Sequence, residues 1–167
     1  MKKTTPVKKA STELSNKEYT STLANLKKHI RSSQLKAAVA VNKELLKVYW
    51  IIGKTIVEKQ ESSGWGSKFI EKLAKDLQNE FPGLEGFSRT NVFRMRAFYQ
   101  EYKLVPPLAG QLDEIDHLGI LTQIPWSHNI ILMEKLDNNE QRIWYATKTI
   151  ENSWGKRALE DWIERDI

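Results

Sequence analysis

The chain has 167 residues and no cysteine, which excludes disulfide bonds, thiol catalysis and cysteine-ligated zinc. Its 40% hydrophobic and 28% charged residues are ordinary for a globular domain, and no apolar run approaches the roughly 18 residues that a membrane span needs. The formal net charge of +5 permits a polyanionic partner without requiring one, because four lysines already lie within the first nine residues.

Residues 1–17 contain lysines but no periodic apolar positions, so we expect a flexible basic tail there. No apolar run follows the lysines, which excludes a secretory signal peptide. One domain is predicted to follow the tail, over residues 18–167. The lack of cysteine and of a targeting signal leads us to expect a cytoplasmic protein without a membrane segment.

Two helices are predicted next, one from Tyr19 to Ile30 and a longer one from Gln34 to Gln60. The first has Leu23, Leu26 and Ile30 on one side. Apolar residues recur along the second at the spacing of one helical face, with lysines opposite. This stripe consists of Leu35, Ala38, Leu45, Tyr49, Ile52 and Ile56, widened by Trp50, Gly53 and Val57.

Gly53 is unusual because glycine costs about 1 kcal/mol relative to alanine inside a helix. We infer that another helix approaches the long helix closely at this residue. Simple tolerance of the glycine is the alternative.

A pair of helices follows, separated by turn residues. The segment "ESSGWGS" (61–67) ends the long helix, and Ser67 can cap a helix over residues 68–80. "PG" at 82–83 ends that helix, because proline lacks an amide donor and restricts the residue before it. Ser88 then caps a second helix within "GFSRTNVFRMRAFYQEY" (86–102).

The rest of the chain is predicted to be helical, with one ambiguous segment. Residues 104–111 form a loop because of their paired prolines and glycine. Residues 112–124 are predicted as either a short helix or an extended wing. Later helices are expected to start at capping residues, namely Ser127, Asp137 with Glu140, and Ser153. We therefore predict a mainly all-α fold. Its core would include Trp50, Leu73, Leu77, Met95, Tyr99, Trp126, Ile143 and Trp154.

The helix over 86–102 has two different faces at 3.6 residues per turn. Its core side carries Val92, Met95, Phe98, Tyr99 and Tyr102. The other side carries the residues that we predict to contact DNA, namely Arg89, Thr90, Phe93, Arg94, Arg96 and Gln100. Arginines suit phosphate and base-edge contacts because the guanidinium fork offers paired donors. The ring of Phe93 could touch a thymine methyl group or a partner surface.

The two helices over residues 68–102 suggest a helix–turn–helix, in which the second helix enters the major groove of DNA. The turn "FPGLEGF" is longer than the three or four residues of the simplest motif. The alternative is an ordinary helix hairpin with a solvated basic face, in which residues 112–124 cover Phe93. A protein–protein module that uses the same face is the second functional hypothesis, because interfaces are enriched in aromatics and arginine.

No group of residues suggests catalysis. The three histidines, His29, His117 and His128, lack metal-ligand spacing, and we expect His128 to bond a neighbouring backbone group. The segment "SGWGSK" (63–68) lacks the spacing and the preceding strand of a phosphate-binding loop. We therefore predict no catalytic, cofactor-binding or metal-binding residues, and no cofactor.

Several short motifs carry a family resemblance that covers about residues 20–166. They are "GWGS", "EFPG", "GFSRTN" with "FRMRAFY", "IPWSH" and "IENSWG", in that order. The chain resembles the N-terminal domain of the YhcG-type bacterial proteins, domain of unknown function family 1016. The resemblance implies a winged helix–turn–helix-like, DNA-binding module.

In this family the domain usually precedes a nuclease domain of the PD-(D/E)xK type. The chain shows no aspartate followed by a Glu-x-Lys strand, so the resemblance assigns no catalytic residue to it. The last helix stops mid-pattern in "WIERDI", and we expect a truncated protein rather than a stand-alone module. The expected function is to bind duplex DNA and position the missing C-terminal nuclease domain. A homodimer is the other assembly considered.

Overall fold

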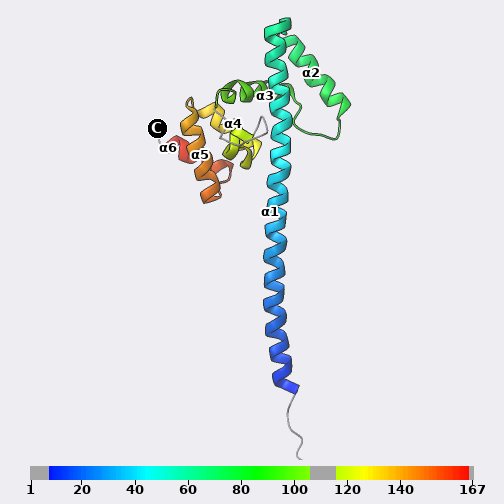
Figure 1. Ribbon diagram of the computed structural model, residues 1–167, viewed down its shortest axis with the longest axis vertical. Helices are drawn as coiled ribbons and strands as arrows, with labels where there is room; N and C mark the ends of the chain where they lie inside the picture. The colour runs from blue at the N-terminus through cyan, green and yellow to red at the C-terminus, as the bar shows by residue number, and fades with distance from the viewer. Residues whose placement is uncertain (1–7, 106–115, 166–167) are drawn as a thin grey trace, which may run out of the picture. The chain divides into compact units, whose positions relative to one another are not determined.

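The computed structural model describes residues 8–105 and 116–165 of the chain (Figure 1). The chain divides into two compact units, Met1–Ala40 and Val41–Ile167, and α1 contributes residues to both. The elements are α1 (Lys8–Ser63), α2 (Ser67–Glu80), α3 (Arg89–Tyr102), the 3₁₀ helix η1 (Asp116–Gln123), α4 (Trp126–Lys135), α5 (Asn139–Asn152) and α6 (Lys156–Arg165).

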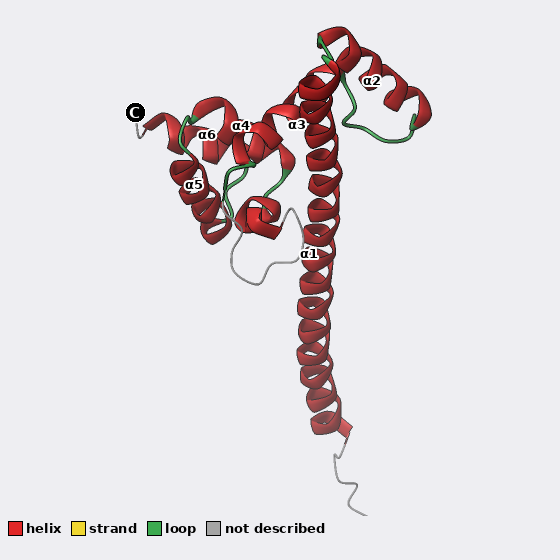
Figure 2. Cartoon of the chain, turned by 45° about the horizontal axis from the view of Figure 1, so that its top comes forward, coloured by secondary structure: helices red, strands yellow, loops and turns green. Residues whose placement is uncertain are grey.

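The prediction of a mainly all-α fold is confirmed. Figure 2 shows helices joined by loops and turns, with no strand in either described range, 8–105 or 116–165. Of the ambiguous segment 112–124, the described part is η1, so the helical alternative holds for Asp116–Gln123 and the extended wing does not. Residues 112–115 lie outside the described residues.

α1 differs from the two helices predicted for its residues. It is continuous from Lys8 to Ser63, without the break that we placed between Ile30 and Gln34. No proline or glycine occurs between Lys8 and Gly53, so the serines at 32 and 33 weaken the helix without ending it. Residues 8–17, which we assigned to the flexible tail, are helical and belong to α1. That these residues are flexible stays a prediction, and residues 1–7 lie outside the described ones.

In the second unit, the end of α1 packs on α3. Leu46, Tyr49, Trp50 and Ile56 of α1 are buried. The Trp50 ring lies edge-on to two aromatic rings of α3, 5.8 Å from Phe98 and 4.8 Å from Tyr99 between centroids. Edge-to-face pairs at these distances are favourable beyond the area that they bury. This contact joins α1 to the hydrophobic core of the second unit.

The predicted apolar stripe on α1 is only partly correct. Tyr49 and Ile56 are buried as expected, but Leu35 is 67% and Leu45 39% exposed. The buried face instead passes through Leu46, one position, or 100°, further round the helix than Leu45. The sequence pattern could not select this register because α1 has apolar residues on both sides.

Gly53 lies where α1 meets α3, which confirms the predicted close approach. A Cβ atom at this position would collide with the carbonyl group of Met95 and lie 3.1 Å from the Cβ of Tyr99. Glycine is therefore required by the helix–helix distance, which excludes the alternative of simple tolerance.

The predicted core residues are buried to different degrees. Trp50 and Met95 are 4% and 0% exposed, as predicted. The other six are only partly buried, and one of them, Trp154, lies in the turn between α5 and α6. They are Leu73, Leu77, Tyr99, Trp126, Ile143 and Trp154.

The predicted helix caps are correct at one position and shifted at the others. Ser88 caps α3, and its hydroxyl oxygen accepts from the amide of Asn91 at 3.2 Å. α5 is capped by Asn138, whose side-chain oxygen accepts from the amide of Glu140 at 2.6 Å; the predicted cap, Asp137, lies one residue too early.

Three serines occupy other positions than those predicted. Ser67 is the first residue of α2, after the N-cap Gly66. Ser127 lies inside α4, because the carbonyl of the preceding proline already accepts the first helical amides. Ser153 ends α5 in a left-handed conformation with φ 53°, a position that commonly terminates a helix.

α3, α4, α5 and α6 complete the second unit by packing on one another. α2 packs against α3, α4 packs against α3, α5 and α6, and η1 packs against α5. In the described parts of the chain, no helix combines the length and the apolar character needed to cross a membrane.

Candidate nucleic-acid interface

The start of α3 is fixed by hydrogen bonds that meet at Asn91. Its side-chain amide donates to the carbonyl of Gly86 at 2.5 Å, and its oxygen accepts from the indole nitrogen of Trp126 at 2.7 Å. Gly86 has φ 104°, a backbone conformation that side chains other than glycine rarely adopt. Asn91 is 9% exposed, and these partly buried hydrogen bonds set the entry of the chain into α3.

The core side of α3 is as predicted. Val92, Met95, Phe98 and Tyr102 are each 0% exposed, and Tyr99 is half-buried against Trp50. The opposite side of the helix is therefore the one that is available for binding.

The six predicted DNA-binding residues lie on this side to different extents. Arg89, Thr90 and Gln100 are exposed, whereas Phe93, Arg94 and Arg96 are half-buried. We define the basic face of α3 as Arg89, Arg94 and Arg96 around Phe93.

Phe93 organises the basic face. The guanidinium carbons of Arg89 and Arg96 lie 5.0 Å and 5.2 Å from the centroid of its ring. Phe93 also packs against the hydrophobic core, so its ring is fixed. Cation–π contacts at this distance are attractive, and the stacked guanidinium keeps its fork of donors at the edge. The contacts with the two arginines and the core therefore explain why an aromatic residue lies among arginines. Neither a contact with thymine nor cover by residues 112–124 is needed for this explanation.

Two of the three arginines form ion pairs with carboxylates from other helices. Arg89 Nη2 lies 2.8 Å from an oxygen of Glu71 on α2, and Arg94 Nη2 lies 2.7 Å from an oxygen of Glu134 on α4. The side chains of Arg89 and Glu71 are 62% and 44% exposed. Exposed pairs contribute about 0–1 kcal/mol, so both arginines can exchange these partners for others.

Arg96 differs from the other two arginines. Its Nε atom is buried and has no hydrogen-bond partner among the described residues, 8–105 and 116–165. Within the same residues no carboxylate pairs with its guanidinium, which is held by the ring of Phe93 alone. Arg96 therefore differs from Arg89 and Arg94 in that no carboxylate of the described residues neutralises its guanidinium.

Glu71 and Glu134 are the components of the face that the sequence did not reveal. Glu134 is 40 positions from Arg94, and no periodicity connects two helices that are so far apart in the chain. Only the packing of α2 and α4 on α3 brings these carboxylates to the arginines.

Two further polar side chains, His128 and Arg142, form hydrogen bonds in the core. The ring nitrogen Nε2 of His128 lies 3.0 Å from the backbone oxygen of Trp154, which confirms the expected bond to backbone. Arg142 has a side chain 3% exposed and donates from Nη2 to the carbonyl of Leu136 at 2.6 Å, at the end of α4. Its Nη1 pairs with Glu101 at 2.6 Å. This buried arginine joins α3, α4 and α5 and is not available to a ligand.

Two buried tyrosines are among the described groups with clearly perturbed titration. Burial raises the pKa of the Tyr102 hydroxyl far above its usual range, although the nearby Arg142 guanidinium partly opposes the rise. Burial also raises the pKa of Tyr49, and a hydrogen bond with Asn91 opposes it. Among the described side chains, no cluster of three or more histidines, aspartates or glutamates could hold a metal ion.

Comparison with known families places this helical unit in a defined group. The family model for the DUF1016 N-terminal domain matches residues 25–167. The chain therefore belongs to the DUF1016 N-terminal domain family, as its motifs indicated. A search of curated proteins and a search of solved structures each found no match.

Proposed function

We propose that this chain binds duplex DNA through the basic face of α3. The observation that carries the proposal is Arg96, which is stacked on Phe93 and lacks a carboxylate partner among the described residues. Phosphate oxygens accept the paired donors of a guanidinium, and such contacts supply most of the affinity of sequence-independent binding.

The two ion-paired arginines support the same proposal. Their partners Glu71 and Glu134 are themselves about half exposed, so a phosphate can replace them at small cost. Thr90 and Gln100 are exposed on α3 and add neutral groups that can bond phosphates or base edges.

The helix pair α2–α3 would act as the helix–turn–helix, with α3 as the recognition helix. The proposal does not require a wing, and the described residues contain no strand that could form one. As in the family resemblance, the bound domain would position a PD-(D/E)xK nuclease domain on DNA, in the cytoplasm. Such positioning needs phosphate contacts and only modest reading of sequence.

The test is a duplex titration at several salt concentrations. We expect Arg96→Ala to weaken binding and to shallow the salt dependence by about 0.9 for each phosphate that the variant no longer neutralises. The triple variant of Arg89, Arg94 and Arg96 to alanine should lose most of the salt dependence. Lys148→Ala is the control, because it removes one positive charge from α5. Binding by the triple variant that equals that of the original chain would overturn the proposal.

A second candidate function is a protein-contact module. Exposed apolar side chains on α2 and the turn after it favour this function: Phe69 is 53%, Phe81 46% and Leu84 59% exposed. Exposed aromatics are typical of interface centres. Under this function, Phe69→Ala would abolish binding to a nuclease domain and leave the duplex titration unchanged.

A further inference from the structure

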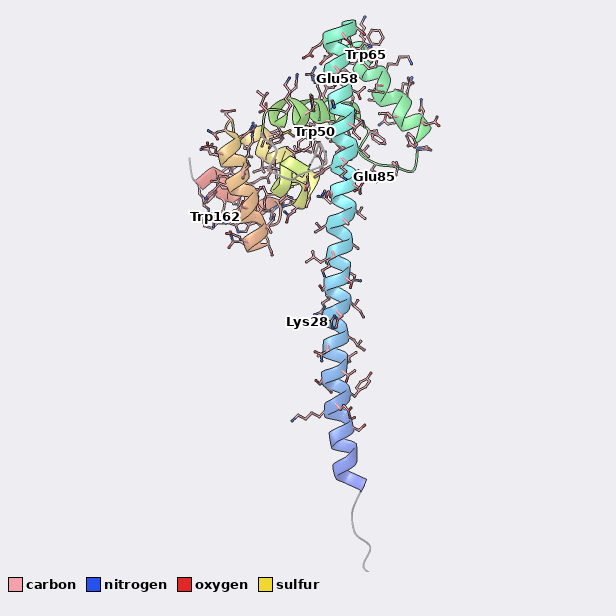
Figure 3. All side chains as sticks on the ribbon, viewed as in Figure 1. Lys28, Trp50, Glu58, Trp65, Glu85 and Trp162 are labelled. Atoms are coloured by element: carbon pink, nitrogen blue, oxygen red, sulfur yellow. The ribbon has the colours of Figure 1, made fainter. Side chains whose placement is uncertain are left out.

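The helical stretch Asn16–Ala40 in the first unit has an exposed apolar side. Tyr19 is 67%, Leu26 53% and Ile30 57% exposed, and only Leu23 among its described side chains is half-buried. Figure 3 shows the side chains of this stretch, Lys28 among them, along a single helix. Within the first unit, the described residues offer no other element that could cover it.

These side chains follow a seven-residue repeat. Steps of three and four residues alternate without exception from Asn16 to Ala40, which is the spacing of the two core positions, a and d, of a coiled coil. The positions are Asn16, Tyr19, Leu23, Leu26, Ile30, Ser33, Ala37 and Ala40. The next two positions of the repeat are Glu44 and Lys47, so the seam ends at Ala40.

The composition of this stretch indicates that the helix needs a partner. Threonines at 20 and 22 and serines at 21, 32 and 33 are weak helix formers. Isolated helices are marginal in water even with better sequences, and most helices are stabilised by packing of their apolar side. A second helix against the seam would supply that packing over about 37 Å.

Two features identify the partner as a second copy. Asn16 occupies an a position, and a single asparagine there selects parallel pairs in which the two asparagines meet. In such a pair, the flanking positions g and e would face each other as Ser15 with Thr20, Thr22 with Lys27, and His29 with Gln34. None of these is a pair of like charges.

An acidic partner helix fits the stretch less well. Lys28 lies at position f and Arg31 at position b, both on the side away from the seam. The flanking positions, which set partner choice through charge, are mostly uncharged. We propose that residues Asn16–Ala40 form a parallel, two-stranded coiled coil with the same stretch of a second copy of this chain.

The first test is the mass of the full chain in solution by light scattering. We expect twice the chain mass of 19.4 kDa, and a return to the single mass in Ile30→Glu. Leu35→Glu is the matched control, because Leu35 is 67% exposed and lies at position f, opposite the seam. All six tryptophans lie beyond residue 41, so their emission verifies that the second unit of each variant remains folded.

The second test uses the absence of native cysteine, which makes any introduced cysteine unique. Leu23→Cys should cross-link to its own counterpart under mild oxidation, because parallel pairing brings the two a positions together. Lys28→Cys should remain uncross-linked. Four results would each overturn the proposal. They are the mass of a single chain for the unmodified protein, a mass above that of a pair, dissociation by Leu35→Glu as complete as by Ile30→Glu, and cross-linking of Lys28→Cys but not of Leu23→Cys.

Discussion

The contact of Gly53 with α3 gives the sharpest stability prediction. In an exposed helix, glycine to alanine stabilises by about 1 kcal/mol. At Gly53 the new methyl group would collide with the carbonyl of Met95 and press on Tyr99, so the two helices must separate. Overpacking of this kind costs about 1–3 kcal/mol, and occasionally more. Separation also loosens the ring contacts of Trp50, so the upper part of that range applies.

The net expectation for Gly53→Ala is destabilisation by about 1–2 kcal/mol, after the gain in helix propensity is subtracted. At about 2–4 °C per kcal/mol, the melting temperature should fall by roughly 2–8 °C. Tryptophan emission during thermal and urea unfolding measures the change in the second unit. Gly83→Ala is the control, because nothing lies within 4 Å of a Cβ at that residue.

The direction in which Gly53→Ala shifts the melting temperature tests whether α1 and α3 approach closely at this residue. If Gly53→Ala raised the melting temperature, propensity would dominate and the close approach of α1 and α3 would be refuted. If Gly83→Ala destabilised the chain as much as Gly53→Ala, the loss would reflect glycine in general and not this contact.

Three further predictions concern buried and paired groups. Arg142→Met should destabilise by about 3 kcal/mol in urea unfolding, since it leaves buried carbonyls unpaired; an unchanged stability would contradict the anchoring role. Folding raises the pKa of Tyr102 above its ordinary value of 10.0, so the folded state favours the protonated hydroxyl. The stability that this hydroxyl contributes is therefore complete below pH 10 and is lost progressively as the pH rises above 10. Tyr102→Phe should therefore reduce the alkaline loss of stability, and unfolding at pH 7 and pH 10.5 measures this. Glu134→Gln should tighten duplex binding by freeing Arg94, while Glu151→Gln on α5 should not; equal effects would contradict a local role.

The sequence predicted best where one face of a helix is apolar and the other polar. On α3, the spacing of Val92, Met95 and Phe98 identified the buried side, and Ser88 marked the first turn. The unexpected glycine at 53 likewise predicted a close helix contact correctly. At each of these positions the residue type has a single physical explanation: burial for the apolar side of α3, capping for Ser88 and close helix packing for Gly53.

The sequence predicted less well where local signals compete. α1 has apolar residues on two sides, so periodicity alone could not show that Leu46 is buried and Leu45 exposed. Adjacent polar residues are equally able to cap a helix, and Asn138 rather than Asp137 has its oxygen within reach of the first amides. The carboxylate of Glu134 depends on tertiary packing, to which local patterns do not respond.

The hydrogen bonds around Asn91 have a consequence for the dynamics of recognition. The hydrogen bonds of Asn91 with Gly86 and Trp126 hold the first turn of α3 in place, so this turn cannot open without breaking partly buried hydrogen bonds. The amides of Asn91 and Val92, which donate to the hydroxyl and the carbonyl of Ser88, should therefore exchange with solvent deuterium more slowly than those of Arg89 and Thr90, for which the helix offers no acceptor. Any ligand would then meet a helix whose backbone is already in place, and side-chain rotation alone would accompany its arrival.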